Sequence, residues 1–354
     1  MSGGMLYEAL SWRSFPTCVA LVFCCLILCA VPIKSTLAQQ KGSHRTQQEL
    51  VAIPLDDRVT EVLRFDTDLI AVDVRVMDRE GRPVRNLNHH DFKLFEDDTE
   101  RPISFFNIER KNGEQRPIAV VFALDISGSM SMQEMERLRG SMGVFSSWLA
   151  ERPSLFAVTS FGMNVRVLQT FTSDIGKFDR AFARLMKEPS GLSTHTYDAI
   201  DDAIKMLSRK APRTRDGRRM KRAVVVVTDG FPVGDVVAPQ TVIERANAAE
   251  VSIYTITLPS FSPALAKTDV TPLPTPLDVS GLVQQTGGVG VYTTDEDFAP
   301  LLHALAAEVT SSYLLAFYPT DEKRRDGRFH TIRVKAPPGF TIRQNRPGYQ
   351  GNMR

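Results

Sequence analysis

Three short segments of the chain carry side chains that could bind a hard metal ion through oxygen. The first runs from Asp125 to Ser129 with the pattern D-x-S-x-S, in which alternate side chains of an extended loop can point at one place. A carboxylate and two hydroxyls suit Mg²⁺ or Mn²⁺, which take about six oxygen ligands and tolerate several waters. The string alone is equally typical of a helix-capping turn, since Asp and Ser are ordinary residues there.

Two further elements follow in order along the chain, namely Thr194 and Asp229. Thr196 is an alternative to Thr194, but Thr194 stands four residues before Asp198. Together the three parts resemble the metal-ion-dependent adhesion site (MIDAS) of von Willebrand factor type A (VWA) domains, and the likeness covers roughly residues 116–312. Ser193, where the family often has glycine, and His195 after the threonine are small departures from that pattern.

The resemblance implies a divalent-metal site formed by Asp125, Ser127, Ser129, Thr194 and Asp229. The serines and, in some states, the threonine would contact the metal directly, whereas the two aspartates would hold it partly through water. A cation with largely neutral ligands keeps enough positive charge to attract a carboxylate. We therefore expect a non-catalytic binding or adhesion module with Mg²⁺ (or Mn²⁺) as cofactor. Its partner would be a protein or other ligand that presents a carboxylate.

Two other functions stay open at this stage. The site could be vestigial in an envelope-assembly or structural component that acts through other parts of the chain. A metal-assisted hydrolase would need a base, and His195 is the one histidine near the predicted metal. Catalysis is disfavoured because the six histidines are scattered and the sequence has no HExxH motif, no GxSxG motif and no glycine-rich phosphate loop.

The elements that position these residues alternate between strand and helix from about residue 114 to residue 312. Apolar repeats such as Met135, Leu138, Met142 and Phe145 predict helices with one buried side. This rhythm predicts an α/β fold with a doubly wound, mostly parallel sheet, Rossmann-like as in VWA domains. The strands before Asp125 and Asp229 would then lie side by side where the winding reverses. The predicted strands are Ile118 to Asp125, Phe156 to Phe161, Val165 to Phe171 as an antiparallel edge, Ala223 to Asp229, Val251 to Leu258 and Val289 to Tyr292.

Short strands flank this part on both sides. Val72, Val74 and Val76 alternate with Asp73 and Arg75, which is typical of a half-buried strand. Too few strands follow residue 313 to form a domain alone. We therefore predict one small β-sandwich made of residues 60–113 and 313–350, with the VWA domain, residues 114–312, inserted in it. The flanks resemble the bacterial VWFA-related family of exported proteins at residues 65–78, 91–97, 313–319 and 346–349.

The first 38 residues look like a cleavable signal peptide, because an apolar run from Cys18 to Ile33 precedes the small residues around Ala38. An uncleaved anchor, or a lipoprotein with Cys29 as the acylated residue, is an alternative. Residues 39–59 are polar and predict a flexible tether. All four cysteines lie in the apolar run, so the mature chain would contain no thiol. The protein would be exported to the periplasm, the medium or the cell surface, with the export signal as its one membrane contact.

Charge identifies no partner, since the formal net charge is +2, and we expect no nucleic-acid partner. One basic stretch, Arg209 to Arg222, is either a solvated loop or a site for an anionic surface. It precedes the strand that ends at Asp229, so it should lie at the opposite end from the metal. The proline-rich segment from Ser260 to Pro276 is expected to be a surface excursion.

Overall fold

A computed structural model describes residues 69–108, 116–127, 132–150, 153–185, 193–258, 274–292, 299–310 and 313–352. The predicted signal peptide and tether, residues 1–59, lie outside the described residues, as do Ser129 and most of the segment from Ser260 to Pro276. Residues Thr60–Arg354 form one compact unit. None of the helices in the described stretches is both long and apolar enough to serve as a membrane span.

A mixed, mostly parallel sheet carries the segments predicted to bind metal. Its described strands are β5 (Ile118–Asp125), β6 (Leu155–Phe161), β7 (Val165–Thr172), β10 (Lys221–Thr228), β11 (Val251–Thr257) and β12 (Gly290–Tyr292). Their spatial order is β12-β11-β10-β5-β6-β7. Neighbours are parallel except β6 and β7, which are antiparallel. The sheet is therefore doubly wound, which confirms the predicted α/β class.

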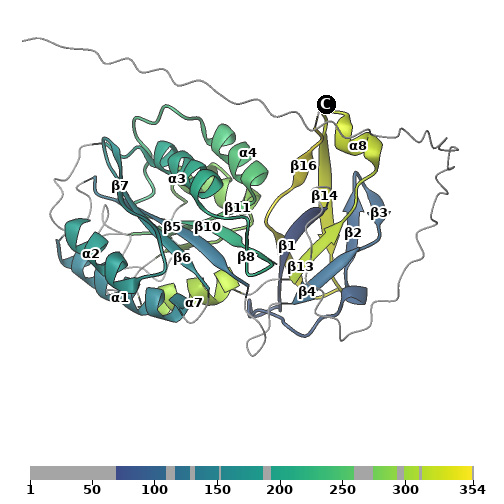
Figure 1. The fold of residues 1–354 in the computed structure, drawn as a ribbon, viewed down its shortest axis with the longest axis horizontal. Coiled ribbons are helices and arrows are strands. Elements are labelled where there is room, and N and C mark those ends of the chain that lie inside the picture. Colours follow the sequence, from purple (N-terminus) through teal and green to yellow (C-terminus); the bar gives the residue numbers. More distant parts are fainter. Residues whose placement is uncertain are drawn as a thin grey trace, which may run out of the picture. The chain divides into compact units, whose positions relative to one another are not determined.

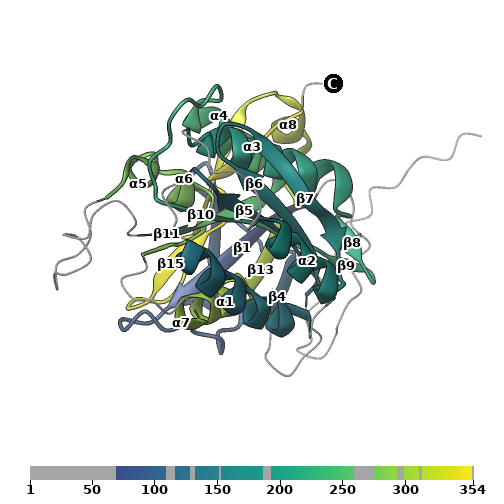
Figure 2. The same cartoon turned by 90° about the vertical axis from the view of Figure 1, so that its left-hand side faces the viewer.

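Helices cover both faces of this sheet (Figures 1 and 2). One face packs against α1 (Met132–Ala150), α2 (Ile175–Leu185) and α7 (Ala299–Thr310). The other packs against α3 (Thr196–Lys210), α4 (Pro239–Ala249), α5 (Pro276–Val279) and α6 (Leu282–Gln285). All eight residues of β5 are buried, because alternate side chains enter the two cores. A strand covered on both faces reads as a continuous apolar run, which is why β5 was recognisable in the sequence.

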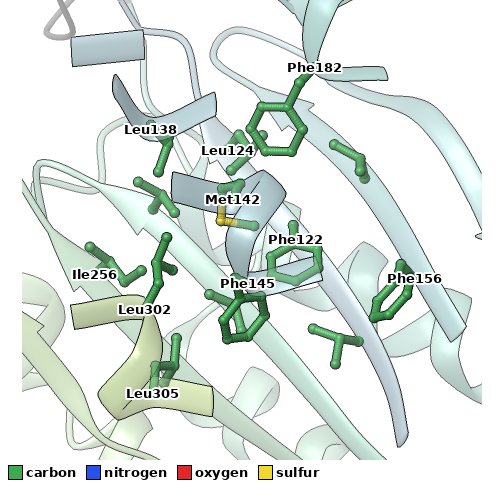
Figure 3. Packing of buried hydrophobic residues seen from close by; sticks show 14 of the residues in the cluster. Phe122, Leu124, Leu138, Met142, Phe145, Phe156, Phe182, Ile256, Leu302 and Leu305 are labelled. Carbon is green, nitrogen blue, oxygen red and sulfur yellow. The ribbon is translucent and has the colours of Figure 1, made fainter. Parts of the chain in front are cut away.

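Aromatic side chains fill the first of these cores (Figure 3). Phe122 on β5 meets Phe145 of α1 and Phe178 of α2 edge to face, with ring centroids 5.6 Å and 5.3 Å apart. Leu138 and Met142 of α1 are fully buried beside them. The helical stripe predicted from the sequence is thus a core-facing side, and the strand that ends at Asp125 is held firmly in place.

Two four-stranded sheets form the flanking β part, and each contains strands from both ends of the described chain (Figure 1). One has the order β15-β1-β13-β4, with β1 (Ile70–Met77), β4 (Phe105–Ile108), β13 (Tyr313–Phe317) and β15 (Thr341–Gln344). The other has the order β16-β14-β2-β3, with β2 (Lys93–Glu96), β3 (Thr99–Arg101), β14 (Phe329–Lys335) and β16 (Gly348–Gln350). The short 3-10 helix η1 (His89–Asp91) and the helix α8 (Asp321–Arg325) also belong to this β part. Side chains of both sheets share one apolar core.

The sequence predicts that β1 has one buried face, formed by its valines, but the face that carries Asp73 and Arg75 is largely buried as well. Arg75 is only 5% exposed. Its guanidinium donates to the carbonyl oxygen of Gly287 at 2.7 Å and to the hydroxyl of Tyr254 on β11. Asp73 forms an ion pair with Arg116, just before β5. The polar face of β1 therefore lies against the α/β part, where Arg75 is hydrogen-bonded and Asp73 is ion-paired.

A histidine clamp joins three segments of the β part. The His330 side chain on β14 is 7% exposed, with Nδ1 2.7 Å from Asp97 Oδ2 and Nε2 3.1 Å from Asp326 Oδ1. Burial opposes a charge on the ring, but the hydrogen bonds and charges of the two carboxylates outweigh it and raise the pKa of His330. With both ring nitrogens facing carboxylates, the protonated ring is the form that fits.

Substituting this histidine should therefore destabilise the protein in a pH-dependent way. A pKa that is raised in the folded state adds stability that is fully present below the ordinary pKa of 6.5 and is lost as pH rises through the raised value. His330→Gln should cost about 2 kcal/mol of unfolding free energy at pH 6 and clearly less at pH 9. Urea unfolding of both proteins at the two pH values measures this, and an equal loss at both would contradict the clamp.

Candidate metal site

Two aspartates stand at the carboxyl ends of adjacent strands. Asp125 is the last residue of β5, and Asp229 follows β10. The two strands are paired in parallel, with Leu124 opposite Val227, so both aspartates emerge at the same edge of the sheet. The winding reverses between these strands, and ligands of open α/β sheets bind in the crevice at such a point.

Asp125 is fully buried and is held at both carboxylate oxygens. Oδ1 accepts the backbone N–H of Ser127 at 2.8 Å, and Oδ2 accepts the hydroxyl of Thr228 at 2.7 Å. Burial raises the pKa of Asp125 to about 6, although hydrogen bonds from Ser127 and Thr228 lower it in part. The nearby charge of Asp229 raises it further. The ionised carboxylate therefore lacks sufficient positive charge around it.

Asp229 adopts the same local turn and is 5% exposed. Its Oδ1 accepts the backbone N–H of Phe231, two residues on, at 3.0 Å. Gly230 between them has φ +86°, and a Cβ there would lie 2.7 Å from the side chain of Thr275. A glycine is required here because larger residues would be strained and would clash. The turn thus fixes the second carboxylate next to the first.

Thr194 is tied to the loop that follows Asp229. It forms an isolated antiparallel bridge with Val233, in which the two N–H···O distances are 3.3 Å and 2.9 Å. Thr194 is 6% exposed, whereas Thr196 is completely buried and its hydroxyl donates to the carbonyl of Thr194 at 3.3 Å. The structure therefore brings Thr194 to the loop that follows Asp229.

The family of this region follows from comparison with known proteins. Residues 119–271 match the family model described as von Willebrand factor type A domain. This part of the chain is a VWA domain. The match covers both aspartates and Thr194, and it agrees with the resemblance stated from the D-x-S-x-S string.

A curated relative and several solved structures are also similar to the chain. Integrin alpha-X of Mus musculus is 30% identical over 139 residues, which is 39% of this chain and 12% of the integrin. The match thus spans about an eighth of that relative's length. An aerotolerance-related membrane protein from Bacteroides fragilis NCTC 9343 is 15% identical, with 54% of this chain and 98% of that chain covered and a TM-score of 0.40. Proximal thread matrix protein 1 from the mussel byssus, solved with a zinc-occupied MIDAS motif, is 13% identical, with 58% and 48% covered and a TM-score of 0.43.

Asp198, on the first turn of α3, organises the loops of the VWA domain around the site. Its carboxylate accepts the backbone N–H groups of Val236 and Val237 and lies 3.0 Å from Nδ1 of His195. Its own N–H donates to Asp235 Oδ1 at 2.9 Å. In the sequence, Asp198 is notable only for its spacing from Thr194. An acidic residue in the first turn of a helix was the available signal, but its partners come from a loop about forty positions away.

Thr228 is a supporting residue that the sequence analysis missed. A threonine at the end of an apolar run is expected from its strand propensity alone, so the pattern gave no sign of a polar role. In the structure its hydroxyl donates to Asp125 Oδ2 and accepts the N–H of Gly230 at 3.2 Å. It therefore links the turn after Asp229 to the carboxylate of Asp125.

Removing that hydroxyl should weaken metal binding without changing the shape of the side chain. Thr228→Val is expected to lower Mg²⁺ affinity about tenfold, because residues that orient ligands typically contribute 10- to 100-fold. Isothermal titration of Mg²⁺ measures the effect. Thr170→Val, in β7 and away from the two aspartates, is the matched control, and an equal affinity for all three proteins would contradict the role of Thr228.

The donors gathered here are oxygens. Within the described stretches, no group of three or more His, Cys, Asp or Glu side chains could hold a metal ion. The candidate set instead combines two carboxylates with hydroxyl groups, as Mg²⁺ and Mn²⁺ accept. The segments that build the site contain no Lys or Arg, namely residues 118–127, 159–165, 193–204 and 226–243. The basic hairpin of β8 (Thr214–Arg215) and β9 (Arg218–Arg219) precedes β10 and lies at the other end of that strand.

Proposed function

We propose that the VWA domain binds one divalent cation, Mg²⁺ or Mn²⁺, and uses it to bind an acidic group of a partner without catalysis. The residues that would hold the cation are Asp125, Ser127, Ser129, Thr194 and Asp229. The observation that carries the proposal is the pair of buried aspartates at the ends of β5 and β10, with no Lys or Arg in the segments around them. Two buried carboxylates without a cation are costly, so the arrangement fits a metal ion.

The residues of the proposed site would have different roles. Asp125 and Asp229 supply negative charge from fixed turns, and Thr228 orients the first of them. Ser127 also donates its hydroxyl to Asp125, so its oxygen stays beside that carboxylate. Thr194 reaches the site from the loop that it shares with Val233. When bound, the cation would supply positive charge and an open coordination position for a carboxylate.

We further propose that the domain works outside the cytoplasm. The support is the signal-peptide pattern of residues 1–38 and the confinement of all four cysteines to that segment. Residues 39–59 would act as a tether, and residues 60–113 and 313–350 would form the β-sandwich that carries the VWA domain, residues 114–312. The pairing of β1 with β13 and of β2 with β14 supports that organisation.

Manganese can report both parts of the proposal in one experiment. Water-proton relaxation of the full chain titrated with Mn²⁺ should show one tight site whose ion keeps rapidly exchanging water. Adding acetate should then lower the relaxation enhancement, because a carboxylate displaces water from the open position. Sodium chloride at equal ionic strength is the control. Tight Mn²⁺ binding with no response to acetate would leave a metal site but refute carboxylate binding, and no tight Mn²⁺ site would indicate a vestigial one.

A further inference from the structure

Apolar side chains are exposed on the loops next to the candidate metal site. Met163 follows β6 and is 60% exposed, and Val233 and Val236 follow Asp229 and are 57% and 88% exposed. Phe231 in the same loop is 46% exposed. We call these four residues the apolar rim. Large apolar side chains grouped on a surface usually mark a binding site, since burying them against a partner is favourable.

Hydrogen bonds fasten both rim loops to the segment that carries Thr194. The backbone N–H of His195 donates to the carbonyl of Gly162 at 3.2 Å, directly before Met163. Thr194 is bridged to Val233, and the Ser193 hydroxyl donates to the carbonyl of the same valine at 2.8 Å. The rim is therefore continuous with the proposed metal site rather than a separate patch.

The charges around the rim restrict the kind of ligand. Residues 159–165, 193–204 and 226–243 contain no Lys or Arg, whereas Asp198, Asp229 and Asp235 all lie in them. A polyanion such as a sulfated polysaccharide would meet repulsion from these three aspartates, and the nearby basic side chain is Arg166 at the start of β7. A single carboxylate surrounded by apolar groups would meet attraction at the cation and burial on the rim. Interfaces between proteins combine these features.

We propose that the ligand is a protein segment that presents one Asp or Glu side chain flanked by apolar side chains. The carboxylate binds the cation, and the flanking side chains pack on Met163, Phe231, Val233 and Val236. This inference rests on the proposed metal-dependent function and names the class of ligand that the same site selects.

A displayed library of random 12-residue peptides tests it directly. The full chain is immobilised in Mg²⁺, and bound clones are eluted with EDTA. The expected pool is at least fivefold enriched in a single Asp or Glu with Leu, Ile, Val, Met or Phe within two positions on either side. Clones eluted by EDTA with acidic runs or polar flanks would overturn the ligand class but leave the metal site standing. A pool in which EDTA releases nothing above background would overturn both.

Two variants separate the rim from the metal. Peptides selected on the double variant Met163→Ser and Val233→Ser should lack the enrichment in apolar flanking residues. They should still contain the single acidic residue. Val144→Ser, on α1 and 63% exposed, is the matched control and should return the wild-type pool. Retained apolar flanks in the double variant would overturn the role of the rim. The composition of the wild-type pool decides the ligand class even if the double variant proves unstable.

Discussion

Replacing Asp125 with asparagine (Asp125→Asn) is expected to weaken Mg²⁺ binding by about 100-fold or more. The change removes one of two buried negative charges while keeping the size of the side chain. The amide can still accept the N–H of Ser127, so the turn at the end of β5 should persist. Isothermal titration of Mg²⁺ gives the affinity, and the loss should exceed that of Thr228→Val because the charge itself is removed.

The same substitution should not destabilise the metal-free protein. Burial raises the pKa of Asp125 to about 6, so at neutral pH its ionised form costs more free energy in the folded than in the unfolded chain. Asp125→Asn removes that penalty, and urea unfolding in EDTA should show equal or greater stability. Asp174→Asn is the matched control, because the Oδ1 of Asp174 likewise accepts the N–H of the residue two positions on, at 2.8 Å, on the exposed start of α2. A clear loss of stability for Asp125→Asn would mean that the carboxylate is structural.

Adding one methyl group at Gly288 should destabilise the protein by about 3 kcal/mol or more. A Cβ at this position would lie 1.7 Å from the carbonyl oxygen of Ile253 on β11. The backbone of Ile253 cannot retreat easily, since it pairs with Val224 of β10 in the sheet that carries the site. Gly288→Ala should therefore lower the urea midpoint of unfolding strongly. Molecules of this variant that remain folded should bind Mg²⁺ as the wild-type protein does.

The control for this prediction is a glycine with open space around it. Gly140 lies in α1, and a Cβ there would have no heavy atom within 4 Å. Gly140→Ala should leave stability unchanged or raise it by up to about 1 kcal/mol, since alanine is the better helix former. Similar urea midpoints for the two variants would contradict the close approach of Gly288 to the backbone of β11.

The α/β fold was predictable because its strands are buried on both faces. Residues 118–124 and 223–227 are apolar throughout, and the lengths and order of such runs identify parallel strands without any partner being known. The positions of Asp125 and Asp229 at one edge of the sheet followed from that order. Candidate metal ligands at the ends of strands were therefore easier to place than those in loops.

Features that depend on distant partners could not be predicted in this way. Arg75 alternates with valines and reads as a solvent-facing residue, yet it is buried by contacts with Gly287 and Tyr254, about 200 positions away. The hairpin between β2 and β3 carries no Asn-Gly or Asp-Gly signal, because Asp97 and Asp98 adopt the left-handed conformations that usually need Asn or Gly. Thr228 and Asp198 gain their roles only from the tertiary fold.

Isothermal titration of Mg²⁺ into the EDTA-treated full chain, beside Asp125→Asn and Asp174→Asn, tests the central claim most directly. We predict one ion per chain for the wild-type protein and Asp174→Asn, and binding weaker by about 100-fold or more for Asp125→Asn. Equal Mg²⁺ binding by all three proteins, or none by a well-folded wild-type chain, would contradict a metal site at the ends of β5 and β10.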